Sequence, residues 1–418
     1  MARTVHIVGA GLAGLAAAVR LTGCAIRIVL HEATAHPGGR CRSYFDRGVG
    51  MEIDNGNHLV LSGNRSVVDF ARAIGSGGRL VGPPTADYPF VDLASGERWT
   101  LRINDGLPVW MFRAARRVPG TRLAEYLRLV RMLRVRADAP LENVLPCAGP
   151  LYQRLLQPVL LAALNIDPPQ GSALLASTVM RETLARGGAA CRPLIAREGL
   201  SRVFIEPALA LLRARGAELR LEHELRALRF ADARVAELDF GNDAATLGEE
   251  DTVILAVPPH AATALVPGLS APRSYRSIAN AHFRIDPPAG MPPMIGVLNG
   301  TAEWIFAFPG RLSVTVSNAD RLMDVPRAKL VEAIWADVAK VAGIAASLPP
   351  WQIVRERRAT FAATPEENAR RPGARTQWSN LFLAGDWTAT GLPATLESAV
   401  RSGNRAADLV AGPLKGSA

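Results

Sequence analysis

Three glycines near the start of the chain have the spacing of a phosphate-binding turn. Residues 9–14 read GAGLAG, so Gly9, Gly11 and Gly14 form the pattern GxGxxG. In such a turn the first glycine permits a tight bend, the second lets a pyrophosphate approach the backbone, and the third lets a helix pack closely on a strand. Glu32 follows at the distance expected of an acid that accepts hydrogen bonds from ribose hydroxyls. The chemistry that these residues predict is the binding of a dinucleotide.

The elements around this motif are those that such a site requires. Residues 4–9 are predicted to form a buried strand, residues 12–21 an apolar helix, and residues 26–30 a second strand that ends near the acid. The helix begins at Leu12 and Ala13, whose backbone N–H groups would face the phosphates at the positive end of the helix dipole. This order predicts a βαβ unit. The unit alone does not distinguish NAD from FAD.

The rest of the chain alternates between two kinds of pattern. Residues 87–103 read as a β-hairpin, and helical patterns dominate from residue 107 to residue 185. Strands and a helix of nucleotide-domain character return at 200–258, four strand-like segments follow, and a short strand and a helix close the chain. We therefore predict an α/β fold, α+β overall, with two domains: a discontinuous Rossmann-like cofactor domain of residues 1–75, 195–272 and 352–418, and an inserted mixed sheet-and-helix substrate domain of residues 76–194 and 273–351.

Composition limits the class of protein. A chain of 418 residues, 49% of them hydrophobic, can bury the cores of two or three domains. Its four cysteines are far apart and match neither a disulfide scaffold nor a metal site, so we expect no metal and a reducing cytoplasm. We expect no secretion signal and no membrane span. The formal charge of +10 would suit an anionic partner, but no nucleic-acid-binding module accompanies it, so nucleic acid is not expected.

Two further glycine motifs lie at opposite ends of the chain. Residues 37–40 read PGGR, and residues 381–386 read LFLAGD before the last helical pattern. With the first motif, they resemble the flavoprotein superfamily of phytoene desaturases, monoamine oxidases and protoporphyrinogen oxidases, over nearly the whole chain. The resemblance implies that the cofactor is FAD. It also implies the residues that hold it: Gly38, Gly39 and Arg40 near the phosphates and flavin, Leu225 at the adenine, Gly385 and Asp386 at the ribityl chain, and Ala394 and Thr395 where a helix begins beside the isoalloxazine.

Segments between these motifs narrow the resemblance to one branch. Residues 41–44 (CRSY), 53–59 (IDNGNHL), 61–64 (LSGN), 357–361 (RRATF) and 385–395 (GDWTATGLPAT) resemble the squalene-associated desaturases, the hydroxysqualene dehydroxylases. The resemblance implies an isoprenoid substrate, hydroxysqualene, which loses its hydroxyl reductively with reduced FAD as hydride donor and gives squalene for hopanoids. The sequence has no second GxGxxG with a strand and a helix around it, so we expect no separate NAD(P)H domain. The electron donor for FAD therefore stays open.

Removal of an allylic hydroxyl requires a proton donor, because hydroxide is a poor leaving group. His58 is the first candidate, with Asp54 as its orienting partner or as the acid itself. The alternative is that Asp54 and Asn55 organise a turn while His58 packs beneath the flavin. His282 and Arg357 are further candidates, each with a structural role in a strand as its alternative.

Other functions on the same fold stay open. A polyprenyl or carotenoid-type desaturase would need the same apolar tunnel and the same flavin. A non-enzymatic escort protein for prenyl lipids would have the fold without the flavin, and the intact motifs at 37–40 and 385–386 argue against it. An amine oxidase is disfavoured. Amine oxidases that the chain resembles commonly use a lysine near the flavin, and some attach FAD through a cysteine near the last motif, but here the last cysteine is Cys191, and Lys329 and Lys340 fall in a predicted surface helix.

Residues 107–141 combine arginines with large apolar side chains in a basic amphipathic pattern. Such a pattern predicts peripheral docking on an anionic membrane surface, from which a water-insoluble substrate could enter. The protein would then be cytoplasmic and peripheral on the inner face of the membrane. An ordinary solvated helix face is the alternative. The arginines are Arg113, Arg116, Arg117, Arg122, Arg128, Arg131, Arg134 and Arg136.

Overall fold

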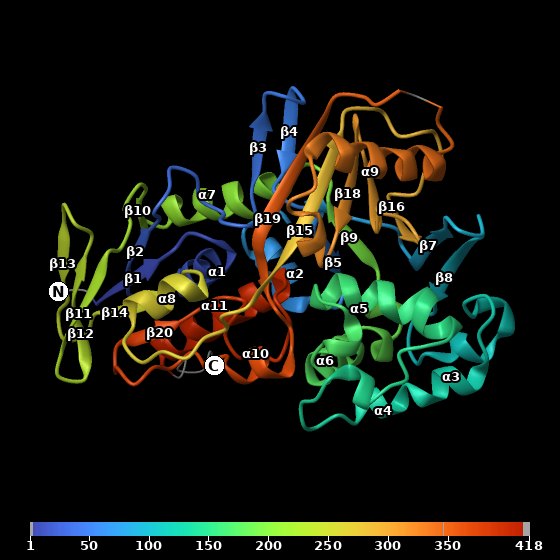
Figure 1. The fold of residues 1–418 in the computed structure, drawn as a ribbon. Helices are drawn as coiled ribbons and strands as arrows, with labels where there is room; N and C mark the ends of the chain where they lie inside the picture. The colour runs from blue at the N-terminus through green and yellow to red at the C-terminus, as the bar shows by residue number, and fades with distance from the viewer. Residues whose placement is uncertain (1–2, 346, 413–418) are drawn as a thin grey trace.

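The computed structural model describes residues 3–345 and 347–412. A five-stranded parallel sheet organises the first domain, with the strand order β10-β2-β1-β14-β20 (Figure 1). Its central strands are buried along their whole length, which explains why they read as unbroken apolar runs. The bounds are β1 Thr4–Val8, β2 Arg27–His31, β10 Glu218–Arg220, β14 Thr252–Leu255 and β20 Leu381–Leu383.

Two helices from opposite ends of the chain pack together beside this sheet. Helix α1 (Leu12–Leu21) follows β1 and has nine buried residues, and α11 (Leu396–Ala411) lies against it. The contact is close because Gly403 has no side chain, and a Cβ there would lie 2.1 Å from the carbonyl oxygen of Ala13. The order β1-α1-β2 confirms the predicted βαβ unit.

A seven-stranded mixed sheet, in the order β19-β15-β18-β17-β16-β7-β8, forms the second domain. The predicted hairpin and the four strand-like segments after residue 270 are all present in it. Parallel pairing of β7 with β16 joins the two separate segments of the chain that form this domain. The bounds are β7 Ala86–Asp92, β8 Arg98–Ile103, β15 Tyr275–Phe283, β16 Met294–Leu298, β17 Trp304–Phe308, β18 Arg311–Val316 and β19 Trp351–Phe361.

Strand β19 differs from the predicted division of the chain. Nearly all of it falls within residues 352–418, which the prediction gives to the cofactor domain, yet it pairs along its length with β15. Figure 1 shows these two long strands running between the domains. The other strands of the five-stranded sheet come from residues 4–31, 218–255 and 381–383, and those of the seven-stranded sheet come from residues 86–103 and 275–316.

Helices cover the remaining faces of both domains. Helix α9 (Arg327–Ala342) packs its buried face on the seven-stranded sheet, where Trp335 meets Phe283. The segment 107–141 is broken into short turns and two short helices, because prolines and glycines interrupt the helical pattern. None of the described helices is long and apolar enough to cross a membrane. The other helices are α2 Arg65–Ala73, α3 Leu123–Arg128, α4 Val130–Leu133, α5 Gln157–Leu164, α6 Ala173–Glu182, α7 Glu206–Ala214, α8 Pro259–Leu265 and α10 Pro365–Ala369.

Three small sheets complete the structure. One of them, β5-β9-β6, brings the chain after the first motifs beside the end of the helical region. The bounds are β3 Ser43–Asp46 and β4 Met51–Asp54 in a hairpin, β5 Leu59–Leu61, β6 Leu80–Val81 and β9 Pro193–Ala196 in the second sheet, and β11 Ala227–Ala231, β12 Arg234–Asp239 and β13 Ala244–Thr246 in the third.

Candidate active site

The turn between β1 and α1 has the geometry of a phosphate cradle. Gly9 has a φ of +103°, and a Cβ on Gly14 would lie 1.9 Å from the carbonyl oxygen of Gly9. A Cβ on Gly11 would meet nothing within 4 Å. No side chain caps the N-terminus of α1, so the N–H groups of Leu12 and Ala13 point into this space without a capping partner. The turn is therefore tightly packed at Gly9 and Gly14 and open at Gly11, as a bound pyrophosphate requires.

Glu32 stands at the end of β2, next to this turn. Its carboxylate accepts a hydrogen bond from the backbone N–H of Ala10 at 2.9 Å and another from that of Thr34 at 3.0 Å. The backbone N–H of His223 bonds to the Glu32 carbonyl oxygen, which brings the segment up to Leu225 alongside. The side chain of Leu225 is buried. Glu32 and Leu225 thus lie at one end of the site, where the resemblance puts the adenosine.

The second and third motifs meet at the opposite end. A nitrogen of the Arg40 guanidinium donates to both carboxylate oxygens of Asp386, at 2.7 and 2.8 Å, and another donates to the Ala359 carbonyl oxygen. The negative charge of Asp386 raises the pKa of Arg40. Gly38 pairs with Gly11 in a parallel bridge, so the PGGR segment lies directly against the phosphate turn. Gly39 follows it with a φ of +56°.

The loop from Gly385 to Thr395 is held from behind. Gly385, at φ +145°, donates its N–H to the Ser402 hydroxyl, and Thr395 caps α11 by accepting from the Ser398 N–H at 3.1 Å. Ala394 and Thr395 line the pocket described below. The loop therefore presents Asp386 on one side and the N-terminus of α11 on the other.

Arg371 is the main residue behind this loop, and sequence reasoning missed it. Its guanidinium donates to the carbonyl oxygens of Asp386, Trp387 and Thr388 and is 7% exposed. It also stacks over the ring of Phe361. Burial lowers the pKa of Arg371 to about 10, against the opposing charge of Asp386. No local pattern signals such a role, because its bonds to the loop go mainly to backbone carbonyls.

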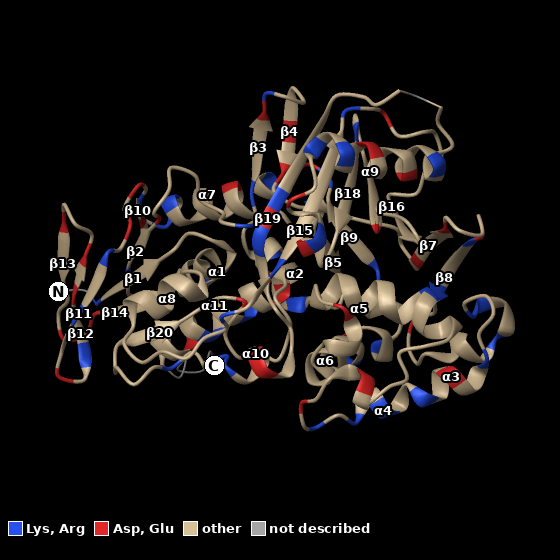
Figure 2. Ribbon diagram, viewed as in Figure 1, with Lys and Arg blue, Asp and Glu red and all other residues tan. Residues whose placement is uncertain are grey.

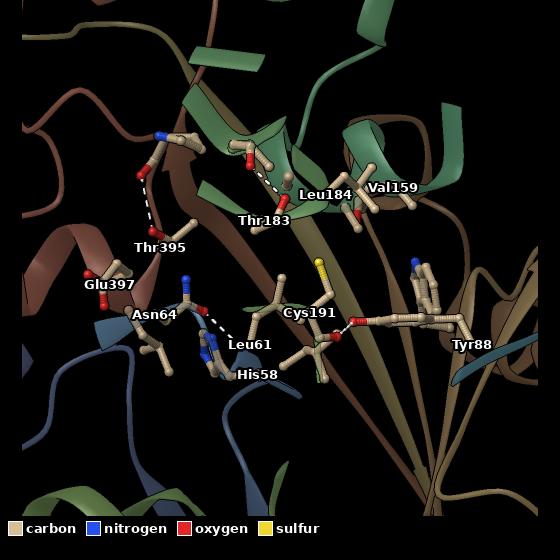
Figure 3. A pocket seen from close by; sticks show the side chains of 18 of the residues that line it. His58, Leu61, Asn64, Tyr88, Val159, Thr183, Leu184, Cys191, Thr395 and Glu397 are labelled. Carbon is tan, nitrogen blue, oxygen red and sulfur yellow. Dashed lines mark hydrogen bonds between the residues drawn. The ribbon is translucent and has the colours of Figure 1, made fainter. Parts of the chain in front are cut away.

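An apolar pocket opens beside these motifs (Figure 3). Its volume is about 270 Å³, just below the roughly 300–1,000 Å³ of typical small-molecule sites. Figure 3 shows His58, Asn64 and Glu397 on one side of it and Tyr88 and Cys191 farther along. The wall comes from the seven-stranded sheet, strand β5, the helical region and the segment where α11 begins. Its apolar members include Leu59, Leu61, Phe90, Leu101, Ile103, Leu155, Val159, Leu184, Trp304 and Phe306.

Polar groups are few in this wall, and both of its carboxylates bond to one arginine. Arg401 donates to both oxygens of Glu182, at 3.1 and 2.7 Å, and to Glu397 at 3.1 Å. Glu397 also accepts from the N–H groups of Ser66 and Val67 at the start of α2. The two acids therefore tie α6, α11 and α2 together, and the one Arg401 guanidinium serves both carboxylates.

His58 lines the pocket, as its candidacy requires. Burial is the main cause that lowers the pKa of His58, and the charge of Arg40 lowers it as well. The charges of Asp54 and Asp386 and a hydrogen bond to the Arg40 backbone oppose the shift. The imidazole is consequently neutral at neutral pH. His58 is placed to contact a substrate, but as a hydrogen-bonding group rather than as a ready proton donor. Its catalytic role stays a prediction.

Asp54 lies behind the pocket wall and not in it. One carboxylate oxygen accepts from the Ser43 hydroxyl at 2.6 Å and from the Leu200 N–H at 2.8 Å, and the other faces Arg311 at 3.3 Å. Both members of the ion pair are at most 6% exposed. Asp54, at the end of β4, is thus placed as a clamp that holds β3, the segment after β9 and β18 together. Its catalytic role also stays a prediction.

The two weaker candidates lie outside the pocket lining. His282 is fully buried in β15, with Nδ1 against the Ser313 hydroxyl, and burial lowers its pKa to about 3. Arg357 forms an exposed ion pair with Asp324 at 2.9 Å. Both positions suit structural strand residues.

The geometry fits an extended dinucleotide. An open phosphate turn lies between an acid at one end and the Arg40–Asp386 pair at the other, and the pocket begins where that pair ends. Residues 12–411 match the family described as flavin containing amine oxidoreductase. The chain belongs to this family. Its cofactor is FAD, as the motifs predict.

Curated relatives within this flavoprotein family match nearly the whole chain. Two proteins named hydroxysqualene dehydroxylase, from Rhodopseudomonas palustris and Sinorhizobium fredii, are each 58% identical to it; alignment covers 98% of this chain in both cases and 99% and 98% of the relatives. A third of the same name, from Zymomonas mobilis, is 46% identical over 97% of this chain and 98% of its own length. The predicted branch of the superfamily is confirmed.

Solved structures of the same flavoprotein fold support the architecture. Cyclohexylamine oxidase from Brevibacterium oxydans superposes with a TM-score of 0.70 over 100% of both chains, at 18% identity. An oxidoreductase from Methanosarcina mazei gives a TM-score of 0.69 over 96% of this chain and 98% of its own, at 14% identity. These likenesses confirm the predicted fold class and nothing finer.

Proposed function

We propose that this chain removes the hydroxyl group of hydroxysqualene and gives squalene, in the supply of squalene for hopanoids. The observation that carries the proposal is the apolar pocket that begins at the flavin motifs, in a chain 58% identical over nearly its full length to proteins named hydroxysqualene dehydroxylase. When bound, reduced FAD supplies the hydride that replaces the hydroxyl.

The residues of this chain bind and position the reactants. The uncapped start of α1, Glu32 and the Arg40–Asp386 pair hold the cofactor along one line. The apolar wall receives an isoprenoid chain and excludes water from the reacting end. His58 offers a neutral imidazole at that end, where it can hydrogen-bond the substrate hydroxyl.

The test of this proposal uses the purified flavoprotein with chemically reduced FAD, incubated anaerobically with hydroxysqualene and, separately, with squalene. We expect squalene as the product of the first incubation and no change in the second. Extra double bonds in either lipid would instead support a polyprenyl desaturase. Unchanged lipid in both incubations, or a protein that does not bind FAD, would support the escort function. Mass spectrometry of the extracted lipid and the flavin absorbance distinguish these results.

We further propose that the segment 107–136 docks on an anionic membrane surface, from which the substrate enters. Five of the eight exposed large hydrophobic side chains of the described residues lie within it: Leu107, Val109, Phe112, Leu127 and Val130. Six of its arginines are exposed as well, and Figure 2 shows basic residues along α3 and α4. Exposed apolar side chains among arginines are the pattern of an interfacial segment, even though the helices here are short.

A further inference from the structure

The reaction needs a proton at the point where the hydroxyl leaves, and the residues around the flavin end of the pocket do not provide one. His58 is held neutral, and both carboxylates in the wall are bound to Arg401. The Thr315 hydroxyl donates to Asn280 at 2.8 Å and accepts from Asn57 at 3.1 Å, so its proton is already committed. The proton must come from another group that reaches this wall.

Ser317 follows directly after the end of β18. It lies two positions after Thr315, so its Cα is about 7 Å farther along the strand, and both side chains line the pocket. Ser317 is 3% exposed. Thr315 bonds to Asn57, beside His58, and Ser317 lines the same pocket, so a substrate in this pocket can contact the Ser317 hydroxyl.

Behind Ser317 stands Glu303, a carboxyl without a cation. Its Oε2 accepts the Ser317 N–H at 2.7 Å, and its carboxyl also bonds to the Ser317 hydroxyl. Among the residues that the structure describes, no arginine, lysine or histidine forms a salt bridge with it; Arg321 is the charged group whose field reaches it. Burial raises the pKa of Glu303 to about 7, with the Ser317 bonds and Arg321 acting against the shift. A carboxyl of this kind carries a proton for a good part of the time at neutral pH.

We propose that Glu303, acting through the hydroxyl of Ser317, supplies the proton with which the substrate hydroxyl leaves as water. The inference rests on the proposed dehydroxylation. Ser317 donates its proton to the substrate oxygen and takes one from the Glu303 carboxyl; the carbon–oxygen bond breaks, and the carbon gains a hydride from reduced FAD, which ends oxidised. The second hydrogen of reduced FAD balances the proton that Glu303 gives up. Ser317 is the catalytic residue in this scheme, and Glu303 acts through it.

Three variants test the proposal. Glu303→Gln keeps an acceptor for the Ser317 N–H but has no acidic proton, and Ser317→Ala removes the relay. Asp337→Asn is the matched control, because the Asp337 carboxylate accepts the N–H groups of Thr301 and Ala302 in the turn just before Glu303 and does not line the pocket. We expect squalene formation to fall by about a hundredfold or more in Glu303→Gln, as for loss of a general acid, and at least tenfold in Ser317→Ala. FAD content should be unchanged, and Asp337→Asn should stay close to the unaltered protein.

Two measurements separate proton supply from a structural role. In the unaltered protein kcat/KM for hydroxysqualene should fall as pH rises through about 7; this fall should persist in Asp337→Asn and vanish from the residual activity of Glu303→Gln. Infrared difference spectra should show a protonated carboxyl that titrates over the same range and is missing in Glu303→Gln. Full turnover with an unaltered pH profile in Glu303→Gln would overturn the proposal. If the unaltered protein made no squalene, that result would contradict the proposed function. The infrared titration would still show whether Glu303 carries a proton near pH 7, so the two proposals can be told apart.

Discussion

Arg40 and Asp386 are 346 positions apart in the sequence, yet one guanidinium nitrogen of Arg40 donates to both carboxylate oxygens of Asp386. The pair joins the second flavin motif to the third at the point where the phosphate turn ends and the pocket begins. Asp386 is 7% exposed, while the Arg40 side chain keeps more than a third of its surface free. One partner is thus fixed in the fold, and the other remains accessible to a bound cofactor.

We predict that breaking this pair weakens cofactor binding more than it weakens the fold. Arg40→Ala leaves Asp386 without its charged donor, and a charged hydrogen bond contributes roughly 1.5–3 kcal/mol, or about ten- to a hundredfold in FAD affinity. FAD per protein chain after gel filtration measures the loss. Arg72→Ala is the control, because its ion pair with Asp69 is exposed on both sides and should contribute little. Equal FAD content in both variants would contradict the assignment of Arg40.

The first motif allows two glycine substitutions with opposite expected results. Gly11→Ala places its Cβ where no atom lies within 4 Å, at a φ of −72° that alanine adopts freely, so the variant should fold but obstruct the pyrophosphate. In Gly14→Ala the Cβ would lie 1.9 Å from the Gly9 carbonyl oxygen, so α1 must shift and the fold itself should suffer. We expect a near-normal melting temperature without FAD for Gly11→Ala, and a markedly lower one for Gly14→Ala. Retention of FAD by Gly11→Ala would show that the phosphates lie elsewhere.

The parts of the fold that sequence reasoning found are those with a local pattern. The βαβ unit, the hairpin at 86–103 and the four strands β15 to β18 each combine a regular apolar pattern with glycine or proline at their ends. Strand β19 lacked that signal, because charged residues from Arg355 to Arg358 interrupt it. The helical pattern of 107–141 was real but broken, since Pro108, Pro119 and Pro140 divide it.

The site divides in the same way. Glycine turns and acids at fixed spacing predicted the cofactor residues, because backbone approach to a phosphate constrains the sequence locally. The clamp of Asp54 on Arg311 and the contact of Glu303 with Ser317 join residues that are 257 and 14 positions apart. Arg371 acts on carbonyl groups that every residue possesses. Such relations depend on the packed structure, and no spacing in the chain announces them.

A row of three histidines in the cofactor domain predicts an acid-sensitive fold. His6 Nδ1 lies 3.1 Å from His31 Nε2, and His31 Nδ1 lies 3.0 Å from His223 Nδ1. Burial lowers the pKa of His6 to about 4 and that of His31 to about 3. The unfolded chain takes up protons near pH 6.5 while the folded chain does not, so the free energy of unfolding should fall by several kcal/mol as pH drops from 6.5 to 4.

His31→Phe tests the histidine contribution, because a phenyl ring can keep the stacking on Phe240. The variant should be less stable at pH 7.5, where it loses two hydrogen bonds, yet its stability should decline less steeply below pH 6.5. Denaturant titrations at a series of pH values measure both. His36→Phe is the control, since His36 is exposed and takes no part in the row. Parallel declines in His31→Phe and the unaltered protein would contradict the histidine mechanism.

Membrane docking predicts separate effects of charge and apolar contact. Each arginine near an anionic surface contributes about 1 kcal/mol, so Arg128→Glu with Arg131→Glu should reduce co-sedimentation with anionic vesicles at least tenfold, and high salt should have the same effect. Leu107→Ser with Phe112→Ser should reduce binding even at low salt. Phe45→Ser is the apolar control, because Phe45 is 66% exposed on β3. Binding that ignores the anionic lipid content would remove the docking proposal.

The last prediction separates the roles of Asp54 and His58. Asp54→Ala leaves Arg311 buried without a counter-charge, which should lower the free energy of unfolding by on the order of 3–5 kcal/mol. The substitution also removes the acceptor of the Leu200 N–H. Asp54→Asn should lose less stability. His58→Gln changes a pocket residue whose neighbours stay packed, so squalene formation should fall while the melting temperature hardly moves.

If Asp54 is only a clamp, Asp54→Asn should turn over as fast as the unaltered protein when both are assayed at one temperature below the melting transition of the variant. The FAD content of the two proteins should then be equal as well. Loss of a structural residue affects the rate through the folded fraction, whereas loss of a catalytic residue lowers the rate of every folded molecule. A reduced rate of the fully folded, fully loaded Asp54→Asn protein would restore Asp54 to the catalytic machinery. The same comparison on His58→Gln should give that reduced rate.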